Sequence, residues 1–131
     1  MNELVEFIRA RIEEDEMVAV AATRGPWTWT APRGYPQQVS NSRAVLIAET
    51  YTNPAFPAYD IEHIVRHDPN RVFREVAAKR KLLDDLFPDI QGMDGMIEGE
   101  WGHHNPAADR LLEVLALPYA DHDDYREEWR P

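Results

Sequence analysis

Two histidines spaced four residues apart, His63 and His67, are the residues whose type and spacing come nearest to metal chemistry. On a helix this spacing places both imidazoles on one face, as in helical zinc sites. The metalloprotease pattern also needs a glutamate directly after the first histidine, and Ile64 stands there instead. Asp68 could be a third ligand, but its place before Pro69 predicts that it caps a helix. A metal-dependent hydrolase that uses His63 and His67 is therefore an alternative hypothesis.

The remaining histidines and the paired acids do not strengthen that hypothesis. His103 and His104 are adjacent, so their side chains point apart in an extended chain. His122 and Asp123 could join the helical pair only if the fold brings all four together. Runs of carboxylates are usually solvated faces, and acid–base catalysis needs two groups whose environments separate their pKa values. With no P-loop, dinucleotide fingerprint or nucleophile elbow in the chain, we assign no catalytic residue, no metal and no cofactor.

The segment 118–131 combines five carboxylates with three large aromatic side chains. Tyr125 and Trp129 are spaced i,i+4, so a short helix would place both rings on one face. Aromatic rings beside charges are common at protein interfaces, and they are equally common in a segment clamped onto its own domain. We expect this C-terminal segment to dock onto the helical body. Tyr119, Tyr125 and Trp129 are kept as candidate partner-binding residues.

Two charged residues fall on helical faces that are otherwise apolar. Arg80 projects near the centre of one apolar stripe, and Asp15 projects onto another. A charge on a core face is costly unless it is paired and hydrogen-bonded. We therefore expect Asp15 and Arg80 to pair across a helix–helix contact, or to reach the edge of the core. The alternative is that Arg80 lines a pocket and holds an anion.

The composition favours one acidic, cysteine-free domain of 131 residues with a formal net charge of −10. The missing cysteines exclude thiolate nucleophiles, zinc–thiolate sites and iron–sulfur clusters. Residues 1–22 hold six acids against two arginines, and residues 118–131 hold five against two, so both ends repel phosphate. The first residues do not resemble a signal peptide, and no apolar run is long enough for a membrane span. We expect a cytoplasmic protein that does not bind membranes.

Periodicity and capping residues predict four helices, at 3–21, 60–67, 69–87 and after Asn105-Pro106. Residues 27–30 and 44–49 are predicted strands, antiparallel to each other, and residues 31–42 and 89–104 are predicted loops. The predicted fold is α+β, a helix-dominated single domain over residues 1–131 with about four helices and a short antiparallel β-ribbon.

The two central helices also resemble a helix-turn-helix in outline. Arg71, Arg74 and Lys81 would lie on the exposed side of the second helix. Acidic residues such as Glu75 and Asp84 interrupt this basic face, which makes it a poor footprint for DNA. Nucleic-acid binding through residues 61–87 is therefore a further alternative, which the net charge of −10 disfavours.

Several segments together resemble a family of small proteins of unknown function from actinobacteria and their phages. The matching segments are EDE at 14–16, AATRGPWTW at 21–29, HIVRHDPNRVFREVAAKR at 63–80, LALPYADH at 115–122 and YREEW at 125–129. The resemblance implies a cytoplasmic protein of the kind that a phage or mobile element encodes. It implies no catalytic residue, because none is assigned to the family.

The leading hypothesis is an accessory or regulatory protein without catalytic activity. Its acidic, aromatic-bearing surface would bind another protein, and assembly with a second copy of the chain stays open. The hydrolase and the nucleic-acid-binding protein are the two alternatives.

Overall fold

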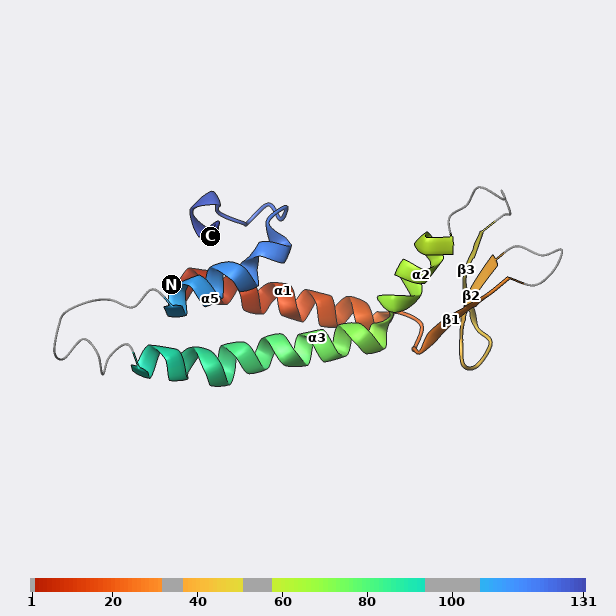
Figure 1. Ribbon diagram of the computed structural model, residues 1–131, viewed down its shortest axis with the longest axis horizontal. Helices are drawn as coiled ribbons and strands as arrows, with labels where there is room; N and C mark the ends of the chain where they lie inside the picture. Colours follow the sequence, from red (N-terminus) through yellow and green to blue (C-terminus); the bar gives the residue numbers. More distant parts are fainter. Residues whose placement is uncertain (1, 32–36, 51–57, 94–106) are drawn as a thin grey trace. The chain divides into compact units, whose positions relative to one another are not determined.

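The computed structural model describes residues 2–31, 37–50, 58–93 and 107–131, and these residues form four α-helices and three strands (Figure 1). The α-helices are α1 (Asn2–Ala21), α2 (Ala58–Arg66), α3 (Pro69–Lys81) and α5 (Ala107–Ala116), and the strands are β1 (Trp27–Thr30), β2 (Gln37–Asn41) and β3 (Leu46–Thr50). Short 3-10 turns cover Leu117–Tyr119 and Glu127–Trp129. This content confirms the predicted helix-dominated α+β class.

The chain divides into two compact units, described separately below. The terminal unit comprises Met1–Glu14 and Val76–Pro131, and the central unit comprises Asp15–Glu75. The helices α1 and α3 contribute residues to both units. Among the described residues, no helix combines the length and apolar character needed to cross a membrane. The single domain over residues 1–131 stays a prediction.

The core of the terminal unit is built from apolar stripes with helical spacing. Leu4, Ile8 and Ile12 repeat every four residues along α1 and are all buried, as their spacing predicts. The other buried apolar side chains of this unit are Phe7, Val76, Leu83, Phe87, Ala108, Leu112 and Ala116. Burying one such large side chain contributes about 1.5–3 kcal/mol. Because this stripe of α1 packs into the core, the remaining faces of the helix are available for contacts with other segments.

The helix that follows Asp68 does not end at Phe87, and this prediction was wrong. A π-helical turn, Leu82–Leu86, follows α3, and helical structure continues through Pro88 to residue 93. A proline inside an α-helix lacks the N–H and clashes with the carbonyl four residues earlier. In the π turn, the N–H of Phe87 donates to the carbonyl of Leu82, five residues back. The wider turn just before Pro88 relieves the clash. Residues 89–93 are thus helical instead of loop, and residues 94–104 lie outside the described residues.

The central unit contains a three-stranded antiparallel sheet in the order β1-β2-β3. The predicted loop over residues 31–42 was wrong for 37–41, which form the middle strand β2. The two predicted strands were correct in type, but each pairs with β2 and not with the other. In β2 only Val39 is apolar, and it is almost fully buried. The sequence QQVSN carries too weak an apolar alternation to reveal a strand that its two neighbours hold in place.

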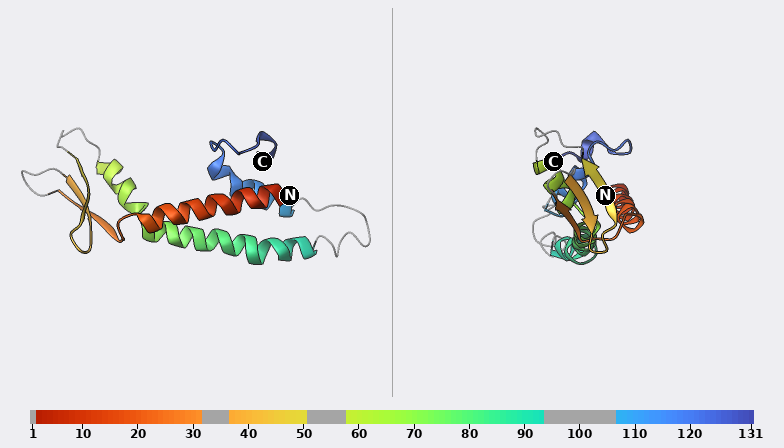
Figure 2. Two further views of the ribbon diagram at one scale, coloured as in Figure 1. Left: turned by 180° about the vertical axis from the view of Figure 1, so that it is seen from behind. Right: turned by 90° about the vertical axis from the view of Figure 1, so that its right-hand side faces the viewer.

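Asp68 joins the start of the sheet to the start of α3. Its Oδ1 accepts a hydrogen bond from the N–H of Arg71 at 2.9 Å, and its Oδ2 accepts one from the N–H of Trp27 at 3.1 Å. The first bond is the helix cap that the sequence predicts. A Cβ on Gly25 would lie 2.7 Å from Asp68 Oδ2, so any other residue there would force the Asp68 carboxylate to shift. In the same unit α2 contacts β1 (Figure 2).

Candidate functional site

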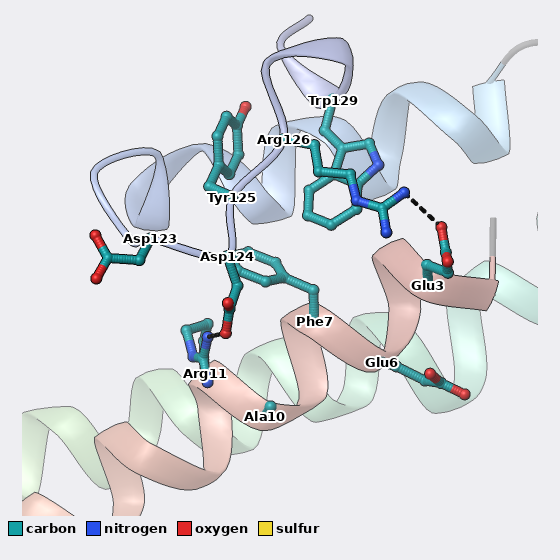
Figure 3. Close-up of a pocket in the computed structure, with 10 residues that line it drawn as sticks. All are labelled: Glu3, Glu6, Phe7, Ala10, Arg11, Asp123, Asp124, Tyr125, Arg126 and Trp129. Carbon is teal, nitrogen blue, oxygen red and sulfur yellow. Dashed lines mark hydrogen bonds and ion pairs between the residues drawn. The ribbon is translucent and has the colours of Figure 1, made fainter.

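The C-terminal segment contacts α1 through one buried aromatic side chain, Phe7. Its ring centroid lies 5.1 Å from that of Trp129, 6.0 Å from that of Tyr125 and 6.5 Å from that of Tyr119. The His122 ring lies 5.8 Å away, and most of these pairs meet edge to face. Figure 3 shows Phe7 pointing from α1 toward the rings of Tyr125 and Trp129. Aromatic pairs at these distances attract beyond their area burial, so Phe7 is the anchor of the segment.

Arg11 is the buried cation of this site, with 8% of its surface exposed. Its guanidinium carbon lies 5.2 Å from the Phe7 ring centroid, within range of a cation–π contact. Nη2 donates to Glu14 at 2.6 Å and Nη1 donates to His122 Nδ1 at 3.0 Å. Asp124 Oδ2 lies 3.7 Å from Nη1. Nε is buried with no hydrogen-bond partner among the described residues, so the polar network around Arg11 is incomplete.

Two hydrogen-bond donors contact the same ring nitrogen of His122, Nδ1. Both Arg11 Nη1 and the backbone N–H of Asp124 lie 3.0 Å from Nδ1. A guanidinium can only donate, so Nδ1 must accept, which places the proton of the neutral ring on Nε2. His122 is therefore a structural acceptor that orients the C-terminal segment over Arg11.

A second cation, Arg126, lies at the other end of the same segment. Its guanidinium carbon lies 5.3 Å from the Trp129 ring centroid, and Nη1 donates to Glu3 Oε2 at 2.7 Å. The carboxylate of Glu128 lies 3.6 Å away. The hydrogen bond to Glu3 and its charge raise the pKa of Arg126 above the ordinary value. Both partners of the ion pair are about half exposed or more, at 49% and 67% of the side chain.

A third cation completes the pattern. The Lys79 ammonium lies 4.8 Å from the Tyr119 ring centroid and 2.7 Å from its hydroxyl. The rings of Phe7, Trp129 and Tyr119 thus each contact a cationic side chain of the same protein. For Tyr125 the described residues show no such cation, and its buried hydroxyl has no hydrogen-bond partner among them.

These side chains border an open groove of about 550 Å³ between the first half of α1 and the C-terminal segment (Figure 3). The residues that line it are Glu3, Glu6, Phe7, Ala10, Arg11, Asp123, Asp124, Tyr125, Arg126 and Trp129. Four carboxylates and two guanidinium groups are among these residues, so the lining is acidic. Among the described residues, Glu6 and Asp123 form no ion pair. They stand on opposite sides of the groove, one on each element.

The residues predicted as a site divide between the two units. Tyr119, Tyr125 and Trp129 meet around Phe7 in the terminal unit, and the latter two line the groove. Asp15 and Arg80 are half-buried, and their mutual pairing stays a prediction. Arg80 lines a cavity of about 30 Å³ beside Arg9, Ile12, Glu13 and Leu83, far too small for an organic anion.

Sequence reasoning missed Phe7 and Arg11, the two residues at the centre of the cluster. A signal for Arg11 was present, because on a helical projection it falls between the apolar residues Phe7 and Leu4. The same test that singled out Asp15 would have found it. The aromatic partners of Phe7 lie more than 110 residues away in the sequence, so their contact left no pattern to read.

The histidine pair His63 and His67 lies at the C-terminal end of α2 in the central unit. His67 Nδ1 lies 2.7 Å from the carbonyl oxygen of His63, and the two ring centroids are 4.2 Å apart. That contact places the proton of His67 on Nδ1, where it serves the last turn of α2. Within the described ranges, no group of three or more histidine, aspartate or glutamate side chains could hold a metal ion.

Three basic residues of α2 and α3 pair with acids four residues away in the sequence. Arg71 pairs with Glu75 at 2.7 Å and Lys81 with Asp85 at 3.0 Å, both at i,i+4 spacing. Arg66 pairs in the same way with Glu62. Two of the three basic residues predicted for the nucleic-acid-binding face, Arg71 and Lys81, are thus paired with carboxylates.

The geometry defines a helix-dominated α+β protein in which aromatic rings packed around Phe7, together with ion pairs, hold the C-terminal segment against the first helix. The whole chain, residues 1–131, matches the model described as Family of unknown function (DUF6221), and the protein belongs to this family. No curated protein and no solved structure matches it. The function must therefore be argued from the groove itself.

Proposed function

We propose that this protein is a non-catalytic accessory or regulatory protein that binds another protein through the groove between α1 and the C-terminal segment. The observation that carries the proposal is the pairing of aromatic walls with two carboxylates, Glu6 and Asp123, that no described cation neutralises. Rings of this kind supply contact area at low entropic cost, and charges at the rim steer the encounter. The partner segment would carry positive charge.

Two features of the site favour binding over catalysis. The groove is open and wide, whereas catalysis benefits from a site that excludes water. Its four acids are all exposed at the surface, whereas acid–base catalysis needs two groups in contrasting environments. The histidine pair in α2 and the salt-bridged helix α3 supply no comparable observation for the hydrolase or the nucleic-acid-binding alternative.

The test is affinity purification from the native host with charge-matched variants. Glu6→Gln with Asp123→Asn removes one carboxylate from each side of the groove. Glu13→Gln with Asp121→Asn makes the same charge change, also one on α1 and one in the C-terminal segment, but outside the groove. We expect a partner that the wild type and the control retain and that the groove variant loses. Equal retention by both variants would contradict the proposal.

A retained partner is then purified and titrated into the protein by calorimetry. Removing two rim charges should weaken binding by about ten-fold at low salt, and less at high salt, since rim electrostatics are screened. Circular dichroism confirms that each variant is folded. An actinobacterial or phage-related origin and a cytoplasmic location are part of this proposal and rest on the sequence motifs alone.

A further inference from the structure

Arg126 stands in the groove as a bound arginine would. Its guanidinium lies against the Trp129 ring, with the centroid 5.3 Å from the carbon, while Nη1 donates to Glu3 at 2.7 Å. Figure 3 shows it reaching from the C-terminal segment toward the first turn of α1. A ring face together with a carboxylate is the recognition chemistry that a guanidinium prefers. The chain therefore contains its own example of the ligand that this part of the groove accepts.

We propose, building on the proposed function, that the groove is an arginine-binding site and that Arg126 is an internal occupant which a partner's arginine displaces. The occupant is an extended, arginine-containing segment of a protein partner. Lysine fits less well because its ammonium is a compact, strongly hydrated charge without the planar fork that stacks on a ring.

The contacts of Arg126 are of a kind that a partner can replace. The ion pair with Glu3 is exposed at 49% and 67% of the two side chains, and exposed pairs are held weakly. Arg126 also leaves Glu6 and Asp123 unused, although both line the same groove. A partner with two or more arginines would gain these carboxylates in addition to the site on Trp129. The internal arginine competes only through its high effective concentration.

The chain offers a matched control in Arg130, four residues further on. Arg130 pairs with Glu127 inside the C-terminal segment and does not line the groove. Arg126→Ala and Arg130→Ala change the net charge equally. Only the first vacates the ring of Trp129 and releases the carboxylate of Glu3. The two variants therefore separate occupation of a site from general electrostatics.

The experiment is a calorimetric titration of the full chain with a ten-residue peptide of alternating arginine and glycine, and with its lysine counterpart. We expect Arg126→Ala to bind the arginine peptide about five-fold more tightly than the wild type, and Arg130→Ala to stay within about two-fold of it. The arginine peptide should bind better than the lysine peptide. Adding Glu3→Gln to Arg126→Ala should abolish the gain.

Equal tightening by Arg126→Ala and Arg130→Ala, or equal binding of the two peptides, would overturn the arginine site while leaving the proposed function in place. Failure of every variant to bind either peptide also overturns the arginine site. If, in addition, the groove variant Glu6→Gln with Asp123→Asn retains every host partner, the proposed function fails as well.

A second variant guards against detachment of the segment. Hydrogen exchange at the amides of His122, Tyr125 and Trp129, which bond within the segment, reports whether it stays ordered. If Arg126→Ala removes that protection, the comparison passes to Arg126→Lys, which keeps the charge near Glu3 but loses the planar stack. That variant should bind the arginine peptide about two-fold more tightly than the wild type. Unchanged or weaker binding would overturn the inference.

Discussion

Among the described residues, each unit contains one deeply buried charged residue, Asp68 at 7% exposure and Arg11 at 8%, but the two are used differently. Both carboxylate oxygens of Asp68 accept from backbone N–H groups, so its network is closed and structural. The guanidinium of Arg11 bonds to the side chains of Glu14, which is exposed, and His122, which is about one-third exposed. Its Nε has no partner among the described residues. A closed network fixes a fold, and an incomplete one beside a groove leaves capacity for a ligand.

The largest expected effect comes from removing the anchor of the C-terminal segment. Phe7→Ala should destabilise the protein by about 3–5 kcal/mol, because a buried ring is replaced by a cavity. Phe73→Ala, a phenylalanine of α3 that is 37% exposed, is the control and should cost less than about 1 kcal/mol. Urea denaturation measures both. Similar costs would show that the segment is not anchored through Phe7.

Asp68→Ala should cost about 2–3 kcal/mol, since it removes the cap of α3 and leaves the Trp27 N–H without its acceptor. Asp68→Asn keeps one acceptor oxygen and should lose roughly half as much. The backbone amide resonances of Arg71 and Trp27 report which bond is lost. If both variants match the wild type in stability, the closed network around Asp68 is not structural.

Arg11→Met should cost only about 1 kcal/mol, despite a burial like that of Asp68. Methionine keeps the packing on Phe7, and the carboxylates of Glu14 and Asp124, 47% and 76% exposed, return to water. His122 keeps the N–H of Asp124 as a donor. The comparison between the two units is broken if Arg11→Met proves as damaging as Asp68→Ala.

The smallest effect concerns the exposed pair Glu127–Arg130. The hydrogen bond from Arg130, helped by its charge, lowers the pKa of Glu127 below the ordinary value. A lowered folded-state pKa contributes stability above the unfolded pKa, and that contribution is lost as the pH falls through the folded value. Carboxyl titration by NMR should return Glu127 to its ordinary range in Arg130→Ala and leave it lowered in Arg126→Ala. If the pKa of Glu127 stayed lowered in Arg130→Ala and returned to its ordinary range in Arg126→Ala, Arg126 and not Arg130 would be the partner of Glu127.

Local features of the sequence predicted most of the helices. The spacing of Leu4, Ile8 and Ile12 gave α1 and its buried face, and Asp68-Pro69 gave the start of α3 together with its cap. Both are short-range signals that a helix needs wherever it packs. The extension through Pro88 was missed, because the proline rule assumes an unbroken α-helix and the π turn removes that assumption.

The middle strand and the centre of the site depend on contacts between distant parts of the chain. β2 has almost no apolar pattern and exists because β1 and β3 supply its hydrogen-bond partners. Phe7 and Arg11 look like ordinary members of an amphipathic helix until the C-terminal segment lies over them. Long-range pairing of this kind depends on where chain segments meet, which no local pattern of residues records.

The sequence by itself thus determined the class of the fold, the acidity of both ends and the aromatic content of the C-terminal segment, because these follow from composition and short spacing. Only the tertiary structure decided that Phe7 is the anchor of this segment, that Arg11 is the buried charge of the site and that Arg126 pairs with Glu3. The physical reason is that each of these contacts joins residues distant in the chain, and its stability comes from burial and charge pairing that exist only once the segments meet.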